Sequence, residues 1–277
     1  MVAAASLWAL LGVYTRVLVP RGYRPDEVAF WRAAGGGACF VVHALVRRQS
    51  LRIARQWWPR LALFAGVCVS IFFAAVPFAV DAGGITLAFV LLYTAPVWVT
   101  LGAGLWLGEH ITTRAWGLVA VTVAGVVLIS WPSGSGGGSG IEVSGTSVGW
   151  GLVAGISYAG FYLVGRNLFE GLGARAVYAV ALPVGAVPLF LLADVHVPTA
   201  SDALVLFGLA AGTTWLPYLL FSYGLARLPS SKAVVIATTE PVIASAIGWT
   251  FYDERLAMIG IVGVVVVLVA SVAAARR

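Results

Sequence analysis

A single acidic residue, Glu240, lies inside a long apolar run, directly before Pro241 in the stretch ATTEPVIASAIG. A helix over 230–252 places this carboxylate roughly 15 Å from the helix start, because an α-helix rises about 1.5 Å per residue. A carboxylate at that depth costs on the order of a few kcal/mol unless it is paired, protonated or exposed to a wet cavity. Two roles fit: a group that binds a proton or an amine on a transport path, or a packing acid beside backbone freed by the proline.

Aromatic residues lie toward the middle of several apolar runs, whereas other tryptophans lie near run ends, where interfacial anchoring explains them. The central aromatic residues are Trp8, Tyr93, Trp98, Tyr158, Tyr162, Trp215 and Tyr218. Their rings suit apolar, aromatic or cationic groups. We expect some of them to line a substrate cavity and the others to pack against neighbouring helices or lipid.

One basic residue, Arg32 in the stretch FWRAAGGG, lies near the start of an apolar run. It could attract a carboxylate at the mouth of a cavity, or it could extend to the membrane interface as long cationic side chains commonly do. The centres of the runs hold no lysine or arginine. This disfavours phosphorylated cargo, which needs fixed positive partners.

The remaining reactive side chains predict neither catalysis nor a cofactor. The histidines, at positions 43, 110 and 196, lack the spacing of four residues that places two metal ligands on one helix face. A nucleophile with its base is not recognisable at membrane depth either. The sequence therefore predicts no catalytic residue, no metal site and no cofactor, and it argues against an intramembrane enzyme.

The composition indicates the elements that must position these residues. Of the 277 residues, 61% are hydrophobic and 10% are charged, whereas about a quarter are charged in an average soluble domain. Apolar runs of about 20 residues, enough to span a bilayer, recur along the chain. They lie near 2–19, 27–46, 58–80, 83–107, 112–131, 147–165, 173–193, 202–226, 230–252 and 256–274. The sequence predicts an all-α membrane protein with ten transmembrane helices.

The distribution of the basic residues predicts the orientation. If the amino terminus is inside, the second, fourth, sixth and eighth loops and the carboxyl-terminal tail hold twelve of the 17 lysines and arginines, and the other segments hold five. The positive-inside rule then places both termini in the cytoplasm of a bacterial-type inner membrane. The net charge of +6 therefore reflects orientation, and we expect no nucleic-acid partner.

Two segments, 88–109 and 233–254, align without a gap at an offset of 145 residues (241 − 96 = 145). Both contain the pattern Thr-x-Pro, and we expect Pro96 and Pro241 to kink the fourth and ninth helices at matched places. The site itself need not be symmetric, because Ala95 occupies the position of Glu240 in the first copy.

A Gly/Ser-rich segment, 132–146, has the composition of a flexible linker. It divides the chain into helices 1–5 over 1–131 and helices 6–10 over 147–277. Because five is an odd number, the two halves must cross the membrane in opposite directions, as an inverted repeat does. Such halves can rock around a midplane cavity and expose it to either side in turn, which favours a transporter.

The sequence also resembles a known family. The stretches LLYTAPVWVTLGAGLWLGEHITTRAWGLVAVTVAGVVLI and TTEPVIASAIGWTFYDERLAMIGIVGVVVVLVAS resemble the EamA repeats of the drug/metabolite transporter superfamily. PDEVAFWRAAGGGACF resembles the second helix of that family, including its arginine, here Arg32. The resemblance implies ten helices, cytoplasmic termini and export of small metabolites such as amino acids.

The sequence thus predicts an alternating-access exporter of a small organic metabolite, an amino acid or a related amphipathic compound. The lipid bilayer is its surroundings, and protons are a candidate coupling ion through Glu240. A broad-specificity efflux pump for drugs or organic cations is the alternative, which differs only in its cargo. An intramembrane enzyme is the competing class.

Overall fold

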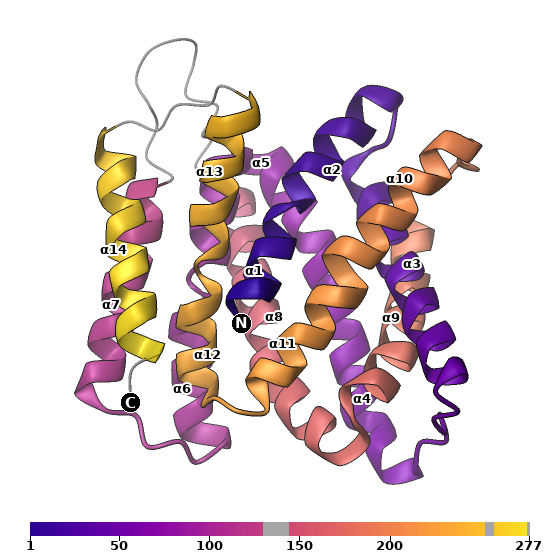
Figure 1. Cartoon of the computed structure of the whole chain (residues 1–277), viewed down its shortest axis with the longest axis horizontal. Coiled ribbons are helices and arrows are strands. Elements are labelled where there is room, and N and C mark those ends of the chain that lie inside the picture. Colours follow the sequence, from indigo (N-terminus) through magenta and orange to yellow (C-terminus); the bar gives the residue numbers. More distant parts are fainter. Residues whose placement is uncertain (130–143, 253–257, 276–277) are drawn as a thin grey trace.

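The computed structural model describes residues 1–129, 144–252 and 258–275, leaving out the side chains at 83–87, 129, 252 and 275. Most of the predicted linker at 132–146 and the end of the duplicated segment, 253–254, lie outside the described residues. The part of the chain that the structure describes is entirely helical (Figure 1). Within these described ranges, eight helical stretches are long and apolar enough to cross a membrane, and two shorter apolar helices cover Thr113–Leu128 and Met258–Ala274. The prediction of an all-α membrane protein with ten such segments is confirmed.

The elements follow each other in two sets, which we call the first and the second repeat. The first repeat contains α1 (Val2–Ala9), α2 (Leu11–Leu18), η1 (Val19–Arg21), α3 (Pro25–Val46), η2 (Arg55–Trp57), α4 (Trp58–Leu63), the π-helix η3 (Phe64–Ile71), α5 (Phe72–Leu92), α6 (Ala95–Trp106) and α7 (Thr113–Ile129). The second contains α8 (Gly145–Leu172), α9 (Ala174–Leu192), α10 (Ala200–Ala210), the π-helix η4 (Ala211–Trp215), α11 (Leu216–Leu225), α12 (Ser230–Ala237), α13 (Glu240–Tyr252) and α14 (Met258–Ala275).

The two repeats have opposite orientations. In Figure 1 the connections α3–α4, α6–α7, α8–α9 and α11–α12 lie at the lower end of the molecule, and α2–α3 and α9–α10 lie at the upper end. The first repeat therefore begins with a span that leads upward, α1–α2, and the second begins with α8, which leads downward. The last helices of the repeats, α7 and α14, pack against each other, as do α5 with α8 and α3 with α9. This is an inverted-topology pair of five-helix repeats.

The fourth and ninth spans are interrupted at matched positions. In the first repeat α5 ends at Leu92 and α6 begins at Ala95, and in the second α12 ends at Ala237 and α13 begins at Glu240. Both pairs are 145 residues apart (237 − 92 and 240 − 95). The predicted kinks are therefore full breaks, with Pro96 and Pro241 in the first turn of each new helix, where a missing N–H is tolerated.

The threonine of each Thr-x-Pro pattern closes the end of the preceding helix. The Thr94 hydroxyl donates a hydrogen bond to the Leu91 carbonyl at 2.6 Å, and the Thr239 hydroxyl donates one to the Ile236 carbonyl at 2.9 Å. The same two carbonyls also accept the backbone N–H groups of Thr94 and Thr239, each at 3.2 Å, so each threonine closes the last helical turn with both its N–H and its hydroxyl. The shared sequence pattern thus encodes a shared helix break.

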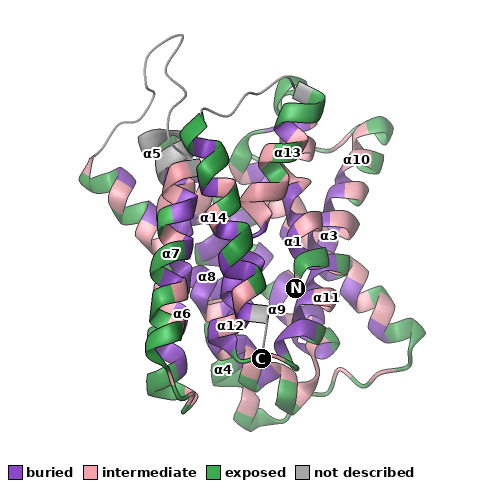
Figure 2. Ribbon diagram, turned by 60° about the vertical axis from the view of Figure 1, so that its left-hand side comes forward, coloured by how far each residue is buried: buried purple, intermediate pink, exposed green. Residues whose placement is uncertain are grey.

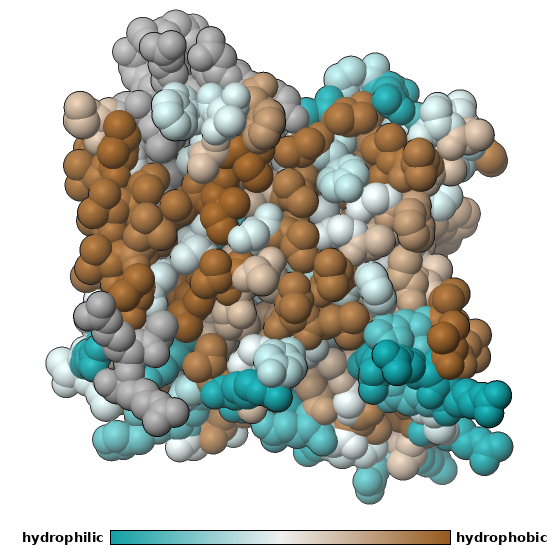
Figure 3. All heavy atoms as spheres, in the orientation of Figure 1, coloured by the Kyte–Doolittle hydropathy of each residue, from teal (hydrophilic) through white to brown (hydrophobic). Residues whose placement is uncertain are grey.

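The surface has the polarity expected of a membrane protein. Buried residues gather along α8 and α12, whereas α7 and α14 are exposed along much of their length (Figure 2). Large apolar side chains such as Leu105, Leu191 and Met258 are each 77% exposed. Figure 3 shows an apolar band across the molecule, with hydrophilic residues concentrated at the lower edge. An exposed apolar band of this kind is the surface that faces lipid.

Candidate functional site

Four of the predicted aromatic residues form a central cluster between the two repeats. The ring centre of Trp8 on α1 lies 6.4 Å from that of Tyr158 on α8 and 5.9 Å from that of Tyr218 on α11. The hydroxyl groups of Tyr158 and Tyr162 are 3.2 Å apart and share a hydrogen bond. All four side chains are buried. Helical spacing of four residues explains the tyrosine pair, because it places both rings on one face of α8.

Further rings that the sequence does not single out extend this cluster. Phe221 lies 5.7 Å from Trp8 and 5.0 Å from Tyr162, and Tyr178 lies 4.9 Å from Tyr218. Their positions carry no recognisable signal, because phenylalanine and tyrosine in an apolar helix face lipid and protein alike. Only the packing of helices distant in the sequence distinguishes them.

Glu240 lies at the amino-terminal end of α13 and is half-buried. Tyr93, in the matching break of the first repeat, is buried and packs with Val126, Val267 and Val242, the last of these on α13. The helix that Glu240 begins also packs against α1, which carries Trp8 of the central cluster. A helix amino terminus carries a partial positive charge that favours an anion in its first turn. The break before α13 therefore gives this half-buried acid a favourable place.

Arg32 points into the protein rather than toward the interface. Its Nε donates a hydrogen bond to the Thr214 hydroxyl at 3.3 Å, and its Nη2 donates one to the Thr213 carbonyl at 3.4 Å. The guanidinium carbon lies 4.7 Å from the ring centre of Phe73, a cation–π arrangement. Phe73 contacts Phe72, which stacks on Tyr158 with 5.4 Å between the ring centres. The guanidinium thus lies at the edge of the aromatic cluster, and Glu240 begins a helix that packs against α1.

The two other predicted tryptophans are engaged elsewhere. The indole N–H of Trp98 donates to the Thr94 hydroxyl at 3.1 Å, and that of Trp215 donates to Nδ1 of His43 at 3.2 Å. Both side chains are half-buried, and the ring contacts found among the described residues do not join either of them to the central cluster. Those residues also contain no group of three potential metal ligands.

The upper end of the molecule joins the repeats through Glu27, which the sequence analysis did not single out. Its side chain is 1% exposed, and it pairs with Nδ1 of His196 at 3.0 Å. Nearby, Arg21 and Asp202 form a second ion pair at 2.8 Å. Burial raises the pKa of the Tyr23 phenol, and the Asp202 carboxylate raises it further. These contacts tie η1 and the first turn of α3 to the α9–α10 connection and the first turn of α10.

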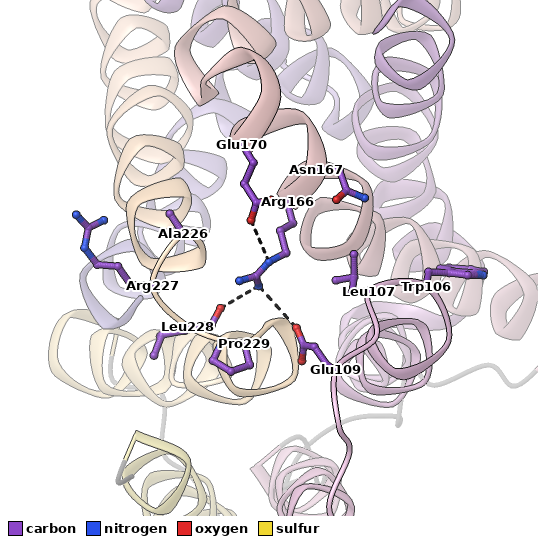
Figure 4. Close-up of a pocket in the computed structure, with 10 residues that line it drawn as sticks. All are labelled: Trp106, Leu107, Glu109, Arg166, Asn167, Glu170, Ala226, Arg227, Leu228 and Pro229. Carbon is purple, nitrogen blue, oxygen red and sulfur yellow. Dashed lines mark hydrogen bonds and ion pairs between the residues drawn. The ribbon is translucent and has the colours of Figure 1, made fainter. Parts of the chain in front are cut away.

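The lower end contains a cavity of about 470 Å³ between α6, α8 and the α11–α12 connection (Figure 4). Arg166 on α8 lies at its centre, with Glu109 and Glu170 on either side. The cavity is lined by two arginines and two glutamates, with Trp106 at one edge. The walls therefore balance positive and negative charge.

Comparison with known proteins matches this chain to a family of transporters and to individual proteins named as transporters. A family model described as the EamA-like transporter family matches residues 1–131 and 145–275. The uncharacterized transporter YwfM of Bacillus subtilis is 28% identical over 262 residues, covering 91% of this chain and 84% of that protein. The pseudopaline exporter CntI of Pseudomonas aeruginosa is 28% identical over 257 residues, covering 90% and 86%.

A solved crystal structure has the same fold. It superposes with a TM-score of 0.81 at 16% sequence identity, covering 98% of this chain and 94% of the other. Matches to the family model cover both repeats, and the relatives are named as transporters. The chain belongs to the EamA-like transporter family, within the drug/metabolite transporter superfamily.

Proposed function

We propose that this transporter exports small organic molecules that carry both an ammonium and a carboxylate group, namely amino acids or related amphipathic compounds. The observation that carries the proposal is the placement of Arg32 and Glu240 around one aromatic cluster. The Arg32 guanidinium lies over the ring of Phe73, whose neighbour Phe72 stacks on Tyr158. Glu240 begins α13, which packs against the helix that carries Trp8. An ammonium group would pair with Glu240, a carboxylate would pair with Arg32, and the apolar part would contact the rings of Trp8, Tyr158 and Tyr218.

The two charged residues come from different repeats, Arg32 from α3 and Glu240 from α13. A rocking motion of one repeat against the other would therefore change the distance between the two binding groups. This arrangement supports alternating access, in which the site is shared by two inverted repeats. The name of the relative from Pseudomonas aeruginosa, a pseudopaline exporter, supports the outward direction.

The orientation and the coupling ion belong to the same proposal. The hydrophilic residues at the lower edge of Figure 3 support a cytoplasmic lower end, both termini in the cytoplasm and an inner-membrane location, by the positive-inside rule. A division into repeats at 1–131 and 147–277, with 132–146 as the linker, fits this topology. Glu240 would carry a proton on the return step, after the ammonium group of the cargo has left.

Counterflow in proteoliposomes tests the proposal with three matched compounds: phenylalanine, its decarboxylated amine phenethylamine and its deaminated acid 3-phenylpropanoate. We expect exchange of phenylalanine and little exchange of the other two, because each of these lacks one of the two charges. Protein-free liposomes correct for passive leakage. Equal exchange of phenethylamine would favour an organic cation pump instead, and exchange of none of the three would refute recognition by paired charges.

A further inference from the structure

The carboxylate of Glu109, just after α6 in the first repeat, binds the start of α12 in the second repeat. It accepts hydrogen bonds from the backbone N–H groups of Ser230 at 2.6 Å and Ser231 at 3.4 Å, and from the Ser231 hydroxyl at 2.9 Å. The first N–H groups of a helix lack intrahelical partners, and the helix dipole favours an anion there. A side chain of one repeat thus caps a helix of the other.

Arg166 on α8 strengthens this connection. Its Nη1 donates hydrogen bonds to the Leu228 carbonyl at 2.9 Å and to the Ser230 hydroxyl at 3.0 Å, and it lies 3.7 Å from the Glu109 carboxylate. The side chains of Arg166 and Glu109 are only 20% and 15% exposed. Charge-assisted hydrogen bonds are the strong ones, and partial burial reduces their screening. Figure 4 shows Arg166 reaching toward both Leu228 and Glu109.

The capped helix leads directly to the candidate site. α12 runs from Ser230 to Ala237, and the break at 238–239 separates it from Glu240. The Ser230 hydroxyl also contacts the carbonyl of Tyr162 at 3.4 Å, and most of α12 is buried. The cavity of about 470 Å³ is lined by Glu109, Arg166 and Leu228, so it borders the contact between Glu109 and α12. A helix that ends at a break can move as a short unit about that break.

We propose that Glu109, Arg166 and the start of α12 form the cytoplasmic gate of the transporter, which we call the Glu109 latch. The structure has the latch closed. When Glu109 leaves the N–H groups of Ser230 and Ser231, α12 swings about residues 238–239 and connects the cavity to Glu240. The latch rests on the proposed transport function, but it does not depend on the chemical class of the cargo.

Glu170 provides a matched control for Glu109. It also contacts Arg166, at 3.4 Å, but it lies four residues further along the same helix and is 60% exposed. The Arg166–Glu170 pair therefore lies within α8 and does not connect two elements. An exposed ion pair between residues four apart on one helix contributes little to stability. If the latch holds the repeats together, loss of charge at Glu109 and at Glu170 must have different effects, although both glutamates contact one arginine.

The test measures the access of water to α12 without any cargo. Val234→Cys, at a position that is 0% exposed, is introduced after Cys39→Ala and Cys68→Ala remove the native thiols. A membrane-impermeant maleimide is then added to inverted vesicles. We expect slow labelling, with labelling about tenfold faster after Glu109→Gln, the factor that corresponds to about 1.4 kcal/mol. Glu170→Gln should label like the parent, and Glu109→Asp should restore slow labelling.

Equal labelling of the parent and Glu109→Gln, or equal acceleration by Glu170→Gln, would overturn the latch. A second arm joins Glu109→Cys to Ser231→Cys with a short bifunctional methanethiosulfonate in the same thiol-free background. Counterflow of phenylalanine should stop after cross-linking and return after reduction, and counterflow that continues through the cross-link would also overturn the latch. Because the labelling arm uses no cargo, failure of the cargo proposal leaves its result interpretable.

Discussion

Glu240 lies in the first turn of α13, where the helix amino terminus favours an anion. This helix belongs to the second repeat and packs against α1 of the first, so the surroundings of Glu240 depend on how the helices are assembled. An acid that stays half-buried remains able to exchange its partners. That property suits a binding group better than a packing acid.

Replacing the carboxylate tests its proposed role in coupling. Glu240→Gln keeps the size of the side chain but cannot take up or release a proton. We expect transport by this variant to lose its dependence on an imposed pH gradient, measured as uptake of phenylalanine into inverted vesicles. Because this variant is also expected to bind phenylalanine more weakly, both measurements use a saturating concentration of phenylalanine, and exchange at that concentration without a gradient is the reference for the variant. A variant that responds to the gradient as fully as the wild type would show that the proton is carried elsewhere.

The buried indole of Trp8 should matter for stability. Trp8 is 5% exposed and packs against three aromatic rings, whereas Trp106 is 74% exposed. Trp8→Ala would leave a cavity, which costs about 3–5 kcal/mol in protein cores. We expect a clear drop in the melting temperature of the detergent-solubilised protein, and a much smaller change for Trp106→Ala. Similar drops in both variants would argue against a central packed cluster.

At the scale of single residues, the sequence identifies side chains whose polarity differs from that of the apolar run around them. A charge in an apolar run identifies Glu240 and Arg32 without a structure. Glu27 escapes notice because an acid near the start of a span is common, and only the structure brings it to His196. Trp98 and Trp215 lie within apolar spans, but their indole N–H groups bind Thr94 and His43. Depth alone does not determine the direction in which a ring points.

At the scale of helices, the feature that matters most for the proposed transport is the break in the fourth span and the matching break in the ninth. Each break follows a threonine that closes one helix and precedes a proline that begins the next. The Thr-x-Pro repeat predicts matched kinks, but full interruption depends on the local turn, which the sequence pattern does not specify. The ninth span is the more consequential, because its break separates α12 from Glu240.

Restoring the missing N–H should slow transport. In Pro241→Ala the new N–H can bond to the Ala237 carbonyl and join α12 to α13, because alanine favours a continuous helix. We expect counterflow to slow severalfold while thermal stability stays the same or increases. Pro25→Ala is the control, because Pro25 begins a helix after an extended residue and should transport like the wild type. Unchanged counterflow in Pro241→Ala would show that the break is not needed for movement.

At the scale of the whole molecule, the sequence predicts the topology but not the contacts between the two repeats. Ten apolar runs and a duplication with an odd number of spans predict the inverted fold, because membrane depth and helix length leave few alternatives. The contacts between the repeats do not follow from the sequence. Glu109 and Ser230 are 121 residues apart, and many charged residues near span ends are equally plausible partners for Glu109. Only the packed arrangement selects among them.

The proposed orientation can be tested on intact cells. Val197, which is 91% exposed, lies between α9 and α10 at the upper end, and Arg52 lies in the exposed connection before α4 at the lower end. In a thiol-free background, an impermeant maleimide should label Val197→Cys on whole cells and Arg52→Cys only in inverted vesicles. The reverse pattern would place the Glu109 latch outside, and labelling of both positions on one side would contradict the fold.

Equilibrium binding of phenylalanine to the purified protein tests most directly whether the two repeats form one site through Glu240 and Arg32. We predict that Glu240→Gln and Arg32→Gln each weaken binding at least about tenfold, the loss expected from one charge-assisted hydrogen bond. The double variant should lose less than the sum of the two, because both groups hold the same ligand. Wild-type affinity in either single variant would contradict a shared site between the repeats.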